Sequence, residues 1–204
     1  GKLQVGLDHG LVFVLLPPGS AGGSGERGGD SNNAIESLFA SKFEMSRAQW
    51  ERLARGTRGL RLRYDGGLDL RNVSGEEAGK PANSVSCDMC MRLLVGYGMD
   101  LPTEVEWEYM ARAGADTPWF TGSDVDGLRF AANVLDISYT NGPSRVTQFD
   151  EVAPFDDGQP GLDLVYAPRL ANHFGLLHVH GNVAEWCQDC TSGNSDPHRE
   201  LRAI

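Results

Sequence analysis

"LPTEVEWEYMARAG", from Leu101 to Gly114, carries the clearest structural signal in the chain. Thr103 precedes Glu106 by three residues, which is the pattern of a capping box, where each of the two side chains accepts a hydrogen bond from the backbone of the other residue. Gly114 stands where a helix commonly ends, because glycine tolerates the left-handed backbone conformation of that position. The sequence therefore predicts a helix over Thr103–Ala113.

Two further helices are predicted upstream of this one. A second capping box, Ser46 with Gln49, opens a helix over Ser46–Arg55, and the predicted buried face of that helix carries Trp50, Leu53 and Ala54. Ser86 is a suitable N-cap for "CDMCMRLLVGYG", in which the apolar residues at helical spacing are Met91, Leu94 and Val95.

The remaining segments favour short strands and irregular backbone. "GLVFVLLPPG" (Gly10–Gly19) reads as a strand followed by a turn, and "SLFASKFEM" (Ser37–Met45) alternates as a strand does. Residues Ser20–Asn33 are predicted to be a flexible surface segment, and "YDGGLDL" (Tyr64–Leu70) is a possible hairpin. After Gly114 no periodic segment reaches helix length, so we expect short strands and turns there.

Composition limits the classes of partner. With 204 residues, 40% apolar content and no internal repeat, the sequence is long enough for one domain with a substantial core, and we expect a single domain over residues 1–204. The net charge of −10 argues against nucleic-acid and anionic-membrane partners, which require a basic patch. No apolar run approaches the roughly 20 residues of a membrane span. With no signal peptide in the sequence either, we expect a cytoplasmic location.

Two Cys-x-x-Cys pairs raise the possibility of a zinc site. Cys87 and Cys90 form the first pair, and Cys187 and Cys190 form the second. Zinc would require all four thiolates to converge. Buried thiols and a disulfide remain the alternative. His178 and His180 could bind a transition metal from one face of an extended strand, or they could be ordinary core or surface histidines.

Several of these motifs together resemble one known family. "LPTEVEWEYMARAG" is followed, in the same order and at similar spacing as in the family, by "PWFTG" (Pro118–Gly122), "AAN" (Ala131–Asn133), "NHFGL" (Asn172–Leu176) and "HGNVAEWCQD" (His180–Asp189). This pattern is similar to that of the formylglycine-generating enzymes, or sulfatase-modifying factors, particularly the bacterial ones, and it extends from Gly10 to about Cys190. The resemblance implies an α+β fold, a variant of the C-type lectin fold, with two helices, a small antiparallel sheet and much irregular structure.

The resemblance also implies two calcium sites. One would use the side chain of Asn133, the carbonyl of Val134, the carboxylate of Asp157 and the carbonyl of Gln159. The other would use the carbonyls of Gly181 and Val183 and the carboxylate of Glu185. His178 replaces the Asn or Asp ligand that the family usually has at this second site, and imidazole is a poor ligand for calcium. Turn capping by Asn and Asp is the alternative interpretation of the first set.

Some positions depart from the family pattern. Cys87 stands where an aromatic residue is usual, and Ala184 replaces the tryptophan of "GNVWEW". In the family, a pair of cysteines in a later segment binds copper and performs the oxidation. This sequence ends at Ile204 without that pair, so we expect a domain truncated at its C-terminus, for which no catalytic residues are assigned.

Two functions of different classes follow from the resemblance. The first is a formylglycine-generating oxidase, which converts a sulfatase cysteine to formylglycine with copper as cofactor, and which we expect to be inactive in this chain. The second is a non-catalytic, lectin-like module that binds a ligand or a protein partner, as in variable proteins of diversity-generating retroelements or kinase-linked domains. A protein or peptide ligand is expected in either case. A sulfoxide synthase of the ergothioneine type would need a histidine triad from another domain, and none is visible.

Overall fold

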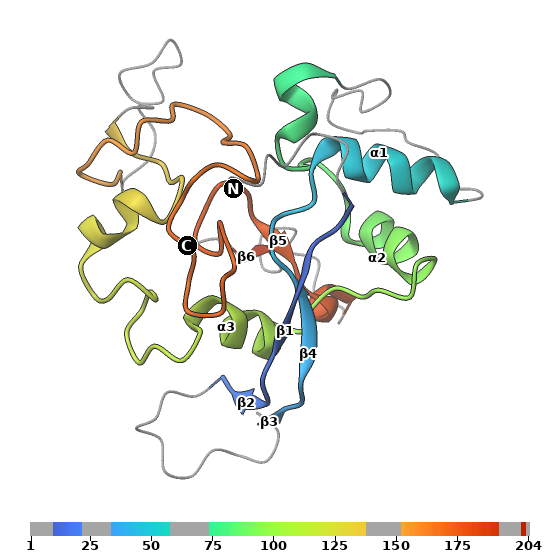
Figure 1. Cartoon of the computed structure of the whole chain (residues 1–204), viewed down its shortest axis with the longest axis horizontal. Coiled ribbons are helices and arrows are strands. Elements are labelled where there is room, and N and C mark those ends of the chain that lie inside the picture. The colour runs from blue at the N-terminus through green and yellow to red at the C-terminus, as the bar shows by residue number, and fades with distance from the viewer. Residues whose placement is uncertain (1–9, 22–33, 58–73, 138–151, 192–200, 203–204) are drawn as a thin grey trace, which may run out of the picture.

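The computed structural model describes residues 10–21, 34–57, 74–137, 152–191 and 201–202. Within these ranges the regular elements are short and are separated by long irregular segments (Figure 1). The strands are β1 (Phe13–Leu16), β2 (Gly19–Ser20), β3 (Ala34–Ile35), β4 (Leu38–Ser41), β5 (Glu185–Trp186) and β6 (Leu201–Arg202). The helices are α1 (Arg47–Gly56), α2 (Cys87–Val95) and α3 (Glu104–Arg112), with short 3-10 helices η2 (Gly75–Gly79), η3 (Val125–Phe130) and η4 (Gln188–Thr191).

The strands in the described ranges pair as three small antiparallel sheets, β1 with β4, β2 with β3, and β5 with β6. Across the β1–β4 pair, Leu16 lies opposite Leu38 and Val14 opposite Ala40. The predicted strands at Gly10–Gly19 and Ser37–Met45 are thus confirmed as shorter elements. Figure 1 shows α1 and α2 on one side of this pair and the irregular segment that follows α3 on the other.

Both predicted capping boxes are present. Ser46 caps α1 and exchanges hydrogen bonds with Gln49, and Thr103 caps α3 and exchanges them with Glu106. These bonds satisfy backbone N–H groups that have no partner inside the helix. The helices predicted from the two boxes are therefore confirmed to within a residue or two.

Helix α2 begins after Ser86 as predicted, but a different face of it is buried. Leu93 and Cys90 are buried, whereas Val95 is 67% exposed. The buried pair is spaced i, i+3, and it packs with Trp50 and Ala54 of α1. Val95 lies in the last turn of α2 and is exposed, so helical spacing alone does not identify the buried face.

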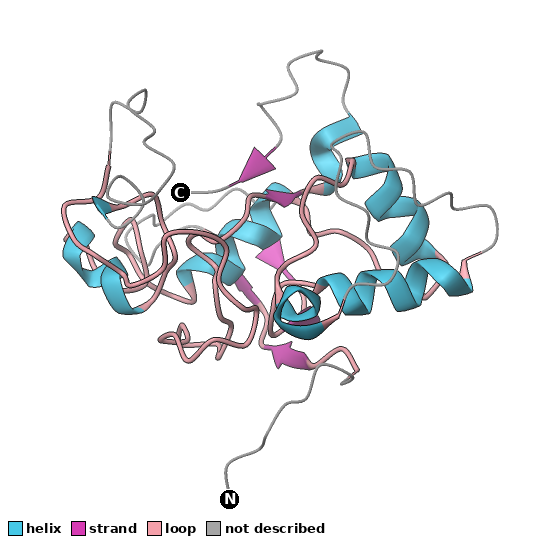
Figure 2. Cartoon of the chain, turned by 90° about the horizontal axis from the view of Figure 1, so that it is seen from above, coloured by secondary structure: helices cyan, strands magenta, loops and turns pink. Residues whose placement is uncertain are grey.

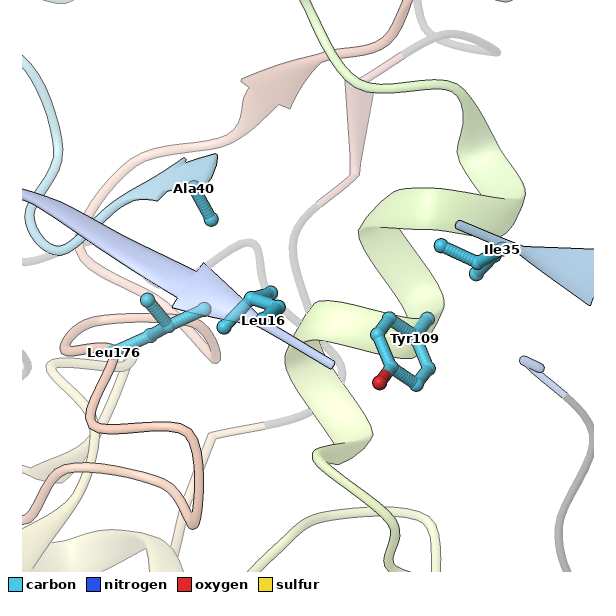
Figure 3. Close-up of a cluster of buried hydrophobic side chains, with 5 residues drawn as sticks. All are labelled: Leu16, Ile35, Ala40, Tyr109 and Leu176. Carbon is cyan, nitrogen blue, oxygen red and sulfur yellow. The ribbon is translucent and has the colours of Figure 1, made fainter. Parts of the chain in front are cut away.

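The main core lies between α3 and the strands. Leu16 of β1, Ile35 of β3, Ala40 of β4, Tyr109 of α3 and Leu176 form one buried cluster. Figure 3 shows these five side chains converging between the helix and the strands. Burying a leucine fully contributes on the order of 1.5–3 kcal/mol, so this cluster fixes α3 against the strands.

Irregular backbone dominates the described residues after α3, as predicted (Figure 2). The possible hairpin at Tyr64–Leu70 lies outside the described residues, and so does most of the predicted flexible segment Ser20–Asn33. None of the described helices has the length and apolar character that a membrane crossing requires.

Candidate functional site

The turn from Gly181 to Glu185 is the centre of the candidate site. Gly181 has φ of 138°, and a Cβ placed there would lie 2.4 Å from the carbonyl oxygen of Asn133. Only glycine fits, because of both the backbone angle and the close approach of the neighbouring chain. The next residue, Asn182, has φ of 64°, and asparagine is among the few residues that adopt this left-handed conformation readily.

Asn182 joins segments that are far apart in the sequence. Its Nδ2 group donates to Glu44 Oε2 at 2.6 Å, and its Oδ1 accepts from the backbone N–H of Asp163 at 2.8 Å and from Asn133 Nδ2 at 2.9 Å. Its backbone N–H donates to the carbonyl of Asn133 at 2.6 Å. One side chain therefore connects the two groups of predicted calcium ligands.

Two carboxylates lie next to this turn. Glu44, which is only 8% exposed, accepts hydrogen bonds from the Asn182 side chain and from the backbone N–H of Val183. Glu185 accepts from Trp107 Nε1 at 2.5 Å. Burial raises the pKa of Glu44 well above its usual value, and the nearby negative charge of Glu185 raises it further. Burial also raises the pKa of Glu185.

A second acidic group forms around Asp157, whose side chain is fully buried. Its Oδ2 accepts from the backbone N–H of Val134 at 3.1 Å, and its Oδ1 accepts from that of Gln159 at 2.8 Å. Burial raises the pKa of Asp157, and the charge of Asp136 raises it as well. The backbone N–H of Asp157 in turn donates to Asp136 Oδ2.

Arg169 supplies positive charge at the edge of this second group. Its Nε donates to Asp163 Oδ2 at 2.8 Å, and its Nη2 lies 3.8 Å from Asp157 Oδ1. It also donates to the backbone carbonyl of Asp157 at 3.3 Å. The Asp157 group is thus partly neutralised by Arg169.

The structure brings the predicted calcium ligands together in two neighbouring groups. Val134 and Gln159 donate their backbone N–H groups to the Asp157 carboxylate, and the Asn133 side chain donates to Asn182. Val183 donates its backbone N–H to Glu44 from the turn that also contains Gly181 and Glu185. Calcium prefers carboxylate and carbonyl oxygens, which are the types of donor that these residues carry. In the described part of the chain, no set of three or more His, Cys, Asp or Glu side chains is arranged to hold a metal. Calcium binding would therefore need backbone carbonyls and water as further ligands.

The two histidines do not share one face of a strand, contrary to the prediction. His178 has φ of 58° and lies in a turn, so successive side chains do not alternate as in a strand. Both imidazoles are almost fully buried. Burial lowers the pKa of His178, and it lowers that of His180 to about 4. His180 stacks on the ring of Phe120, so it is a core residue.

The cysteines do not form a zinc site. Cys87 is disulfide-bonded and therefore cannot provide a thiolate. Cys90 and Cys187 are buried, and burial raises the pKa of the Cys90 thiol to about 12. The side chain of Cys190 lies outside the described residues.

Sequence reasoning missed several residues of the site. Glu44, Asn182, Asp136, Asp163 and Arg169 were not singled out. The available signals in the sequence were the acidic residue shortly before the first capping box and the "GN" dipeptide. The long-range contacts that these residues make leave no local pattern in the sequence.

The sequence profile of the sulfatase-modifying factor enzyme 1-like domain matches residues 9–203, and the chain belongs to this family. The formylglycine-generating enzyme of Thermomonospora curvata is 31% identical over 117 residues, which are 56% of this chain and 35% of that relative. That of Mus musculus is 30% identical over 112 residues, covering 53% of this chain and 27% of the relative. A Mus musculus protein named inactive C-alpha-formylglycine-generating enzyme 2 is 36% identical over 92 residues, covering 44% and 25%. The matches thus span about a third or less of these curated relatives.

Solved structures confirm the fold class. Treponema denticola variable protein 1 superposes with a TM-score of 0.52 at 16% identity, covering 90% of this chain and 74% of that one. CarF superposes with the same TM-score and identity, covering 88% and 80%. The α+β, lectin-like architecture expected from the sequence is therefore correct.

Proposed function

We propose that this chain is a formylglycine-generating-enzyme-like domain that binds a segment of a protein partner and does not itself oxidise a cysteine. The observation that carries this proposal is the state of the described cysteines. Copper(I) prefers soft thiolate ligands, but Cys87 is disulfide-bonded, and Cys90 and Cys187 are buried. The described cysteines therefore do not fit a copper site.

Family membership supports the protein-binding part of the proposal. The resemblance implies that active members act on a cysteine within a protein segment, so a related surface would be suited to such a ligand. The relative named inactive supports a non-catalytic member on this fold. The alternative, an active oxidase, would require thiolates from cysteines other than Cys87, Cys90 and Cys187.

We further propose that calcium stabilises the site. Asn133, Val134, Asp157 and Gln159 would hold one ion, and Gly181, Val183 and Glu185 would hold the other, with Glu44 as an additional carboxylate at the second. Bound calcium would supply the positive charge that offsets the buried carboxylates. The turn would then be fixed in one conformation.

The catalytic question is tested with a peptide that carries the Cys-x-Pro-x-Arg sequence expected for sulfatases. The peptide is incubated with the chain, copper, a reductant and oxygen, and is then analysed by mass spectrometry. We expect measurable peptide binding by fluorescence anisotropy and an unchanged peptide mass. Appearance of the aldehyde product, and its loss in Cys187→Ser, would overturn the non-catalytic proposal.

A further inference from the structure

A large cavity is lined by the β1–β4 pair and the helices. It has a volume of about 1130 Å³, and β1, β4, all three α-helices and β5 contribute to its walls. Small-molecule pockets usually have volumes of about 300–1,000 Å³. The cavity is therefore large enough for a polypeptide segment.

The lining of the cavity is apolar and aromatic. Trp50, Trp107 and Trp186 contribute to it, together with Phe13 and Phe39 of the sheet. Phe39 is 69% exposed and lies directly opposite Leu15, which is 60% exposed. The apolar surface thus continues out of the cavity onto the outer face of β1 and β4. Exposed apolar surface of this kind commonly marks an interaction site.

The charged groups of the lining all have the same sign. Among the described residues the cavity is lined by four carboxylates, and no lysine, arginine or histidine lines it. The four are Glu44, Asp100, Glu106 and Glu185. Glu44 and Glu185 belong to the proposed calcium site, so basic side chains of an occupant would complement Asp100 and Glu106. In the described chain β1 and β4 form a two-stranded sheet, and an extended segment can bind along such a sheet edge.

We propose that the cavity binds an extended segment of a partner protein that combines large apolar side chains with arginine or lysine. This inference rests on the proposed function as a protein-binding domain, and it names the chemistry of the partner. The apolar side chains would fill the tryptophan-lined part, and the basic ones would lie near Asp100 and Glu106 at its wall. Ala184 also lines the cavity and is exposed, so a larger side chain there would occupy part of the space.

The probe is a dye-labelled peptide in which leucine and arginine alternate, compared with a twin that carries uncharged citrulline in place of arginine. We expect the arginine peptide to bind at least tenfold more tightly than the twin, as measured by anisotropy in calcium-containing buffer. Its unlabelled form should also shift the tryptophan emission, because three of the four tryptophans line the cavity. Equal binding of the two peptides would overturn the charge assignment.

Two pairs of variants locate the binding. Ala184→Phe should weaken binding at least tenfold, whereas Ala34→Phe, at an exposed position outside the lining, should not. The double variant Asp100→Asn/Glu106→Gln should weaken the arginine peptide severalfold and leave the twin unchanged, since glutamine still supports the α3 capping box. Glu36→Gln/Glu76→Gln is the control, with the same change of charge at exposed positions outside the lining.

The outcomes separate the two proposals. If the peptide binds equally well to Ala184→Phe and does not shift the tryptophan emission, the cavity is not the site, although protein binding survives. If neither this peptide nor the Cys-x-Pro-x-Arg peptide binds, the proposed function fails. A dimer in sedimentation equilibrium that Ala184→Phe dissociates would show that a second copy fills the cavity, and that result would overturn the partner assignment.

Discussion

Asn182 illustrates how one residue can organise a site built from irregular backbone. Its side chain bonds to Glu44, Asp163 and Asn133, which come from three separate segments. Glu44 and Asn182 are 138 positions apart in the sequence. Turns were predicted for the chain after Gly114, but no local pattern in a sequence reports a contact over such a separation.

The first prediction concerns this asparagine. Asn182→Gly should lower the free energy of unfolding by about 2–4 kcal/mol, because it leaves several buried polar groups without partners. Glycine tolerates the positive φ, so backbone strain does not add to the loss. Chemical denaturation measures the effect. Asn83→Gly is the control, since the Asn83 side chain accepts a hydrogen bond from Arg47 and its loss should have a smaller effect. Equal losses in the two variants would refute the organising role of Asn182.

The second prediction concerns the reactivity of Cys90. The thiolate is the reactive form of cysteine, and burial raises the pKa of this thiol from 9.0 to about 12. At pH 8 the folded protein should therefore react with iodoacetamide at Cys90 at least about a hundredfold more slowly than the unfolded protein. Raising the pH from 8 to 10 should increase the native rate without reaching the unfolded rate. Peptide mapping by mass spectrometry measures both, and equal rates at pH 8 would contradict the buried position.

At the scale of elements, helix ends were more predictable than strand pairing. The capping boxes at Ser46 and Thr103 lie within four consecutive residues each, so sequence alone located the starts of α1 and α3. The strands were harder because their partners are set by distant segments. The pairing of β5 with β6 at Leu201–Arg202 is an example. The buried face of α2 was also misassigned, because packing against α1 decides which side is covered.

The third prediction tests the contribution of a capping box. Thr103→Ala removes the hydroxyl that accepts from the backbone N–H of Glu106 and should destabilise the domain by about 0.5–2 kcal/mol. Thr103→Ser keeps the hydroxyl and should cost much less. Thermal unfolding followed by circular dichroism compares the two. A serine variant as unstable as the alanine variant would show that the threonine acts through its methyl group instead.

At the scale of the whole molecule, the acidic sites hold together segments that lack regular structure. The Asp157 group connects the region after η3 with the loop at residues 156–163, and the turn at Gly181–Glu185 connects both to Glu44, just before α1. The resemblance alone predicted which residues would form two calcium sites, and that assignment stays a prediction. The proximity of the two groups of predicted ligands and the presence of Arg169 beside one of them depend on tertiary packing.

The last prediction uses Glu44 to distinguish a calcium site from a purely structural acidic pair. Burial and the charge of Glu185 raise the pKa of Glu44 in the folded state. A carboxyl group with a raised folded pKa contributes stability below its unfolded pKa, and that contribution is lost as the pH rises through the folded pKa. In chelator at pH 7, Glu44→Gln should therefore raise the melting temperature, because glutamine has no ionisable group and so does not carry the cost of the raised pKa. The gain should shrink as the pH is lowered to about 4.

With calcium present, the unmodified chain should instead melt at a higher temperature than Glu44→Gln. A ligand at 100 times its dissociation constant adds about 2.7 kcal/mol to the stability of the folded state, so calcium should raise the melting temperature of the unmodified chain. Glu44→Gln and Glu185→Gln should each lose part of that rise, since a neutral amide is a weaker calcium ligand than a carboxylate. Asp157→Asn should lose a separate part, and differential scanning fluorimetry with calcium or EGTA measures all three. If calcium stabilises the Glu44→Gln, Glu185→Gln and Asp157→Asn variants as much as the unmodified chain, the ion binds elsewhere and the buried acids serve only as hydrogen-bond acceptors for the turn.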